Sequence, residues 1–170
     1  MSGASELTLN GAGTVVVRAS QAGDATYAAA PDVLQSFVVS ANFGSWLYGV
    51  FDETERGNPL ISGPNAVFGQ DGLPNLVKYA LGLDPKVNAT SGLPEVTTDA
   101  TYWLYTYTRP ADRADLTYTV QYSTNLTSWS DIPSGTEHAL IASGGGTETW
   151  RARYALASAA NLYFRLKVTQ

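Results

Sequence analysis

One loop carries residues at the spacing of a calcium site. The stretch "GQDGLPNLVKYALGLDP" runs from Gly69 to Pro85. In an EF-hand-type loop a glycine occupies the sixth position, and oxygen atoms at fixed positions around it hold Ca²⁺. With Gly72 in that position, Asp71 falls on the fifth and Asn75 on the ninth. These two residues are therefore the candidate metal ligands of the sequence.

The other ligand positions of this loop argue against a bound ion. Val67 and Gly69 stand where carboxylates are needed, and Lys78 stands where a glutamate should close the site. Ca²⁺ takes about six to eight oxygen ligands, and an ammonium group would repel it. We therefore predict no metal in this degenerate EF-hand-like loop. Instead, Asp71 should cap the following helix, and Lys78 should pair with a nearby carboxylate.

Aromatic side chains recur in "TYWLYTYTR", a predicted strand with apolar residues on both faces. Trp103, Tyr105 and Tyr107 share one face, because side chains alternate along a strand. If this row of flat rings is exposed, it is a candidate platform for binding carbohydrate. The alternative, which we favour, is that the row fills the core or an interface between subdomains.

The sequence contains no convincing catalytic constellation. The single histidine, His138, lies near a glycine-rich turn and is interpreted as a surface residue. Ser123, Ser134 and Asp131 have the residue types of a hydrolytic triad, but no G-x-S-x-G elbow surrounds either serine. The acidic run "DETE" is interpreted as a solvated helix end. We predict no enzymatic activity, no catalytic residue and no cofactor.

The elements that carry these residues fall into three stretches. In the last, segments such as "DLTYTVQYS" alternate apolar and polar residues, and turns such as "STNLTSW", "IPSG" and "SGGG" separate them. This period of two is typical of strands with one face in water. The pattern predicts a mainly β protein whose C-terminal part, residues 89–170, is an antiparallel β-sandwich of the immunoglobulin or fibronectin type.

The middle stretch, residues 41–88, changes to the period of a helix. "FGSWLYGVFDETE" places apolar residues three and four apart, and "LPNLVKYALGL" forms a second amphipathic helix. Gly82 is placed to end that helix in a left-handed conformation, with Pro85 just beyond it. These signals predict a short helical hairpin.

The first stretch, residues 1–40, is predicted to form the strands "LTL", "TVVVRAS" and "QSFVVS", with a hairpin turn at Asn10-Gly11. So few strands cannot build a stable core alone. Either they pack onto the helices and the C-terminal sandwich, which we favour, or they leave their edges open to another chain.

Composition excludes several classes of protein. The chain has 170 residues, a net charge of −5 and a pI near 4.7, which argues against nucleic acid and anionic lipid as partners. It has no cysteine, so neither disulfides nor thiolate metal sites can form. No apolar run is long enough to span a membrane. "MSGASELTL" lacks the pattern of a signal peptide, so the chain is expected to be cytosolic or a piece of a longer exported protein.

Three segments together resemble parts of large bacterial surface proteins. "GAGTVVVRASQAGDATYAAAPDVLQSFVV" resembles the closing strands of a bacterial immunoglobulin-like repeat. "DGLPNLVKYALGLDP" is similar to a calcium-loop-like segment that often follows, and "DLTYTVQYSTNLTSW" with "YFRLKV" looks like the β domain that commonly closes such proteins. The order of the three pieces matches as well.

The resemblance implies an extracellular or cell-surface module of a multi-domain bacterial protein. Residues 1–40 would be a partial immunoglobulin-like strand unit, and the whole chain would act as a non-catalytic spacer or anchor. Its partners would be the neighbouring domains of the parent chain. An alternative is an adhesin-type sandwich that binds carbohydrate or a surface protein; a fragment of a glycan-active enzyme is a third. Side chains of lysine such as Lys78, Lys86 and Lys167 also raise the idea of an intramolecular cross-link to Asn or Asp.

Overall fold

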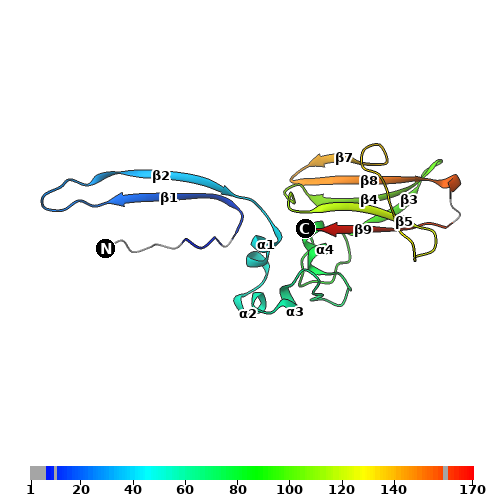
Figure 1. Ribbon diagram of the computed structural model, residues 1–170, viewed down its shortest axis with the longest axis horizontal. Helices are drawn as coiled ribbons and strands as arrows, with labels where there is room; N and C mark the ends of the chain where they lie inside the picture. Colours follow the sequence, from blue (N-terminus) through cyan, green and yellow to red (C-terminus); the bar gives the residue numbers. More distant parts are fainter. Residues whose placement is uncertain (1–6, 10, 159–160) are drawn as a thin grey trace.

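The computed structural model describes residues 7–9, 11–158 and 161–170 and is shown in Figure 1. Within these residues the protein is mainly β, with three antiparallel sheets and a few short helices between the first sheet and the other two. Two of the sheets are arranged as a β-sandwich, as the alternating C-terminal segments predict.

The first sheet is a hairpin of β1 (Gly13–Gln21) and β2 (Ala30–Val39), which extends away from the rest of the molecule (Figure 1). Almost all of its residues are exposed; Val38, for example, is 73% exposed. The expectation that this segment packs onto the helices and the sandwich is therefore wrong. The predicted strand at Leu7–Leu9 is not formed either, and Asn10 of the predicted turn lies outside the described residues.

The two faces of this hairpin differ in character. The register pairs Val15 with Phe37 and Ala19 with Val33, so these side chains share one apolar face with Val17. The opposite face is mixed and includes an exposed ion pair between Arg18 and Asp32, at 3.5 Å. The hairpin thus has the alternation of a strand pair that covers a core, although nothing in the described chain lies on its apolar face.

The helical segment, residues 43–89, contains four short helices: α1 (Phe43–Val50), α2 (Glu53–Arg56), α3 (Pro59–Ser62) and α4 (Asn75–Leu81). Asn42 and Asp52 begin α1 and α2 as capping boxes. The predicted second helix corresponds to α4. The predicted first helix, "FGSWLYGVFDETE", is divided at Phe51 and Asp52 into α1 and α2, and α3 is a single turn within the expected loop. Gly82 ends α4 at φ 70°, as predicted.

The sandwich consists of one four-stranded and one three-stranded sheet. The first has the order β3 (Glu95–Thr98), β4 (Tyr102–Pro110), β8 (Thr147–Ala155), β7 (His138–Gly144), and the second has the order β6 (Ser130–Asp131), β5 (Thr117–Ser123), β9 (Tyr163–Thr169). A single turn of 3-10 helix, Leu156–Ser158, follows β8. The "SGGG" turn joins β7 to β8, with Gly145 and Gly146 at positive φ, as its sequence predicts.

Two clusters of buried side chains form the core. The larger lies between the sheets and contains Leu81, Tyr105, Tyr107, Val120, Ile132 and Ala152. The smaller joins α1 and α4 to the start of β5 and contains Phe43, Tyr79, Ala80 and Leu116. Because Leu81 belongs to the sandwich core, the end of α4 is packed onto the sandwich and does not hang from it as a flexible linker.

Candidate functional site

The most unusual group in the molecule is the ammonium of Lys78, on α4. The whole residue is buried. Its Nζ lies 2.8 Å from Asp71 Oδ2 and donates hydrogen bonds to the carbonyl oxygens of Val87, at 2.8 Å, and Pro85, at 3.3 Å. We call these four residues the ammonium cage. A buried charge is tolerated only when it is paired and hydrogen-bonded, and here both conditions are met.

Asp71 is itself fixed by the backbone on either side of the cage. Its Oδ1 accepts a hydrogen bond from Leu73 N at 3.0 Å, and its Oδ2 accepts one from Ala89 N at 2.8 Å. The hydrogen bond from Lys78 and those from the backbone lower the pKa of Asp71 from 3.8 to about 2. The carboxylate therefore stays ionised at neutral pH and ties the loop before α4 to the chain after it.

A further hydrogen bond joins the same two stretches of chain, the one before α4 and the one after it. Asn88 Oδ1 accepts a hydrogen bond from Gln70 N at 2.7 Å. A side chain at Gly69 would place its Cβ 2.6 Å from that oxygen, so Asn88 would have to move away from Gln70 N. The residues before and after α4 thus approach each other closely, with Lys78 between them.

The two candidate metal ligands are not brought to one site. Asp71 pairs with Lys78, while the buried Asn75 side chain donates to the carbonyl oxygens of Ile61, at 2.7 Å, and Gly63, at 3.0 Å. The predicted helix cap is wrong, because α4 has no side-chain cap and Asp71 bonds to Leu73 N instead. The predicted pairing of Lys78 with a carboxylate is confirmed. Within residues 7–9, 11–158 and 161–170, no three His, Cys, Asp or Glu side chains are grouped to hold an ion.

The short distance between Lys78 and Asp71 is also that of a possible amide cross-link. Such a bond needs a neutral amine and a carboxyl group that can lose its oxygen as water. A pKa of about 2 keeps the Asp71 carboxylate ionised, and an ionised carboxylate is a poor electrophile. The chemistry of the cage is therefore that of an ion pair.

A second polar group fastens the helices to the sandwich. Asp115 accepts hydrogen bonds from Phe43 N, at 2.8 Å, and from the hydroxyl of buried Tyr79, at 2.9 Å. The guanidinium of Arg113 lies 4.2 Å from the centre of the Tyr79 ring and donates to Tyr79 O. Hydrogen bonds to a charged group are each worth about 1.5–3 kcal/mol. One loop of the sandwich thereby fixes both α1 and α4.

The predicted carbohydrate platform is corrected by the burial of its members. Tyr105 and Tyr107 are 6% and 2% exposed, and Trp103, on the same face, is half-buried. Tyr105 stacks on Phe164 with ring centres 5.6 Å apart, across the space between the sheets. This row fills the core, which is the alternative that the sequence favours, so it presents no line of exposed rings.

His138 is buried and not a surface residue, so that prediction is wrong. It is 5% exposed and its Nε2 lies 3.0 Å from the Tyr107 hydroxyl. Its ring contacts the edge of Trp150 at 5.4 Å between centres. Burial lowers the pKa of His138 below its usual value, so the ring is neutral at pH 7. It serves as a polar member of the core and is hydrogen-bonded to Tyr107.

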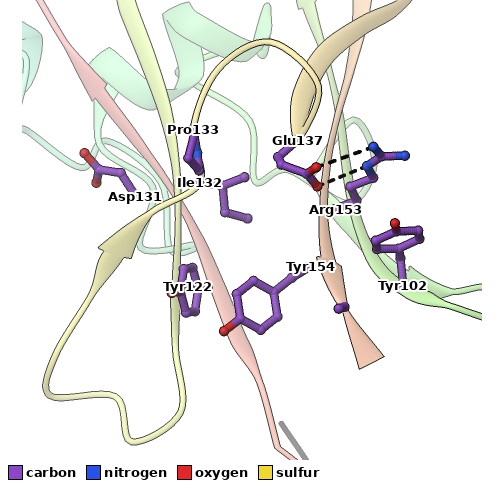
Figure 2. Close-up of a pocket in the computed structure, with 9 residues that line it drawn as sticks. Tyr102, Tyr122, Asp131, Ile132, Pro133, Glu137, Arg153 and Tyr154 are labelled. Atoms are coloured by element: carbon purple, nitrogen blue, oxygen red, sulfur yellow. Dashed lines mark hydrogen bonds and ion pairs between the residues drawn. The ribbon is translucent and has the colours of Figure 1, made fainter. Parts of the chain in front are cut away.

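An open cleft lies at one end of the sandwich and was not predicted from the sequence. It has a volume of about 520 Å³ and brings together Tyr102, Tyr122, Asp131, Glu137, Arg153 and Tyr154, as Figure 2 shows. We call it the tyrosine cleft. Its residues come from β4, β5, β6, β8 and the loop before β7, so no single stretch of sequence signals it.

The side chains of the tyrosine cleft are held in place by one another. Tyr122 and Tyr154 pack with ring centres 4.2 Å apart, and the Tyr122 hydroxyl raises the pKa of Tyr154. Arg153 donates to Glu137 through Nε, at 3.0 Å, and Nη2, at 3.4 Å, and its guanidinium lies 4.8 Å from the centre of the Tyr102 ring. Both charges of this ion pair are partly exposed to solvent.

Searches of protein-family models, curated proteins and solved structures found no match to the chain. Among the described residues, no helix has the length and apolar character needed to cross a bilayer.

We predict that Lys78→Met lowers the melting temperature by roughly 5–10 °C, because it leaves the Asp71 carboxylate without its cation. Thermal unfolding followed by circular dichroism measures this. The control Lys167→Met, at an exposed position of β9, should change the melting temperature by less than about 2 °C. Equal melting temperatures for Lys78→Met and the native protein would show that the cage does not stabilise the fold.

The cage should also make stability depend on acid. Because the pKa of Asp71 is lowered in the folded state, its contribution to the free energy of unfolding is complete above its ordinary value of 3.8 and is lost as the pH falls toward about 2. Urea unfolding between pH 5 and pH 2 should therefore show a smaller loss of stability for Asp71→Asn than for the native protein. The control Asp32→Asn, in the exposed hairpin, should keep the native slope. An unchanged slope in Asp71→Asn would contradict the assignment.

Proposed function

We propose that this chain is a non-catalytic connecting module of a multi-domain protein. The observation that carries the proposal is the contrast between the hairpin and the helical segment that follows it. The hairpin is a largely exposed strand pair with an apolar face, whereas the helical segment is fixed to the sandwich by buried polar groups. A fixed joint that presents incomplete strands is suited to joining neighbouring domains.

The hairpin has the properties of strands that belong to a larger sheet. An isolated two-stranded hairpin is at best marginally stable in water. Val17, Val33 and Phe37 on its apolar face are 42%, 63% and 40% exposed, and neither strand has a second neighbour within the described chain. Such open edges and apolar faces favour association with further strands.

The proposed occupant of this face is a β-sheet of the neighbouring domain. Strands of nine and ten residues offer a face of roughly 300 Å². Two copies packed face to face would bury about 600 Å², which is less than the roughly 1,200 Å² of a specific interface. A sheet that pairs with the edges and also covers the face would bury more than a second hairpin can.

The resemblance of residues 11–39 to closing immunoglobulin-like strands supports the same occupant. In this proposal the hairpin completes an immunoglobulin-like sandwich whose other strands belong to the parent chain. The C-terminal sandwich would be of the immunoglobulin or fibronectin type, and the parent protein would be a bacterial surface or secreted protein.

The state of the acidic and basic side chains supports a role without turnover. In the tyrosine cleft, Glu137 is paired with Arg153, and Asp131 Oδ1 accepts from the Gln121 amide at 2.6 Å. His138 is enclosed in the core. A general acid or base must be free to bond with its substrate, and the Nε2 of His138 is already bonded to the Tyr107 hydroxyl.

Amide hydrogen exchange tests the proposal. In the 170-residue chain alone, amides of β1 and β2 should exchange at least about a hundredfold faster than those of β4 and β8, because few buried contacts stabilise the hairpin. In the protein isolated from its natural source, the same hairpin amides should become as protected as those of β8. Unchanged exchange in the natural protein, or a natural protein no longer than this chain, would contradict the proposal.

A further inference from the structure

The tyrosine cleft lies at the end of the sandwich farthest from the helical segment. At the near end, Pro110 of β4 packs on Gly82, and the Tyr118 hydroxyl donates to Ala80 O. Tyr102 and Tyr122 stand at the opposite ends of the same two strands. A ligand in the cleft would therefore be presented away from the joint and the hairpin (Figure 1).

We propose that this cleft binds a neutral carbohydrate. Its volume of about 520 Å³ falls within the range of small-ligand sites, about 300–1,000 Å³. The proposal is independent of the connecting role, because it uses none of the residues of the hairpin or the ammonium cage.

Aromatic rings supply the apolar part of the site. Tyr122, Tyr154 and Tyr102 are all half-buried, so each ring keeps part of its surface toward the cleft. Ile132, 4% exposed, backs the wall from the core. A tyrosine combines a flat apolar face with a hydroxyl at its rim, which matches the C–H face and hydroxyl edge of a pyranose ring.

Polar groups of the cleft are positioned to bond with hydroxyl groups. Arg153 uses Nε and Nη2 for Glu137 and is stacked beside Tyr102, so its guanidinium is oriented before a ligand arrives. Asp131 bonds to Gln121 on the face of its sheet opposite to Tyr122, so its carboxylate points away from the cleft, and Glu137 is the acceptor at the partly exposed rim. Positioned donors and acceptors reduce the entropy that is lost on binding.

The balance of charge selects the class of ligand. The charged side chains that face the cleft, Glu137 and Arg153, form an ion pair. An anionic ligand would have to displace Glu137 from Arg153, and a cationic ligand would meet Arg153 and a Glu137 that is already paired. A neutral ligand with many hydroxyl groups and one apolar face avoids both costs.

The test is an NMR titration of the ¹⁵N-labelled chain with maltotriose, cellotriose, xylotriose and chitotriose. At least one should shift amides around Tyr122, Asp131 and Tyr154, while tri-galacturonate and choline should not. Tyr154→Ala should weaken the affinity at least about tenfold, whereas Tyr27→Ala, at an exposed ring in the hairpin, should leave it within about twofold.

Glu137→Gln provides a second variant, at a half-buried position of the rim, in case the loss of Tyr154 disturbs folding. It should weaken binding at least about threefold while the spectrum stays dispersed. The proposal is overturned if none of the four sugars shifts the cleft amides at about 20 mM, or if choline or tri-galacturonate binds in their place. Equal weakening by Tyr27→Ala would also place the site elsewhere.

Discussion

The arrangement of this protein depends on one buried lysine ammonium, which is enclosed by the stretches of chain before and after α4. Lys78 is completely buried, and Asp71 with the carbonyl oxygens of Pro85 and Val87 surrounds its charge. These oxygens resemble the donor set that a hard cation takes, one carboxylate with backbone carbonyls. The side chain supplies the positive charge that balances the Asp71 carboxylate, and it is covalently part of the helix that it anchors.

The position of the cage explains how the chain is joined. The cage closes the loop around α4, and Asp115 then binds both Phe43 N and the Tyr79 hydroxyl. Since Leu81 enters the core between the sheets, α4 belongs at once to the helical segment and to the sandwich. The chain leaves this fixed segment as the exposed hairpin at one side, and the tyrosine cleft lies at the other end of the sandwich. The hairpin and the tyrosine cleft therefore lie on opposite sides of the body that the helical segment and the sandwich form.

Local patterns in the sequence predicted the elements well, and long-range contacts account for what they missed. The strand containing Val120 alternates regularly, and Gly82 ends its helix as expected, because each depends on neighbours in sequence. The burial of His138 was missed because the register of β7 shifts between Leu140 and Ala142, so its sequence offers little alternation. The cleft was missed because it brings together strands that are far apart in the sequence. Apolar residues such as Val38 predicted a buried hairpin, although no partner for it lies in the described chain.

The arrangement around α4 requires that the Lys78 ammonium, and not a bound metal ion, is the cation that pairs with Asp71. The most direct measurement is the melting temperature of the native chain in EDTA and in about 5 mM CaCl₂. If the ammonium fills the cage, the two values should agree within about 1 °C, because a ligand that does not bind the folded state cannot stabilise it. A rise of several degrees with calcium would mean that an ion occupies this loop, and the role given to Lys78 would be wrong.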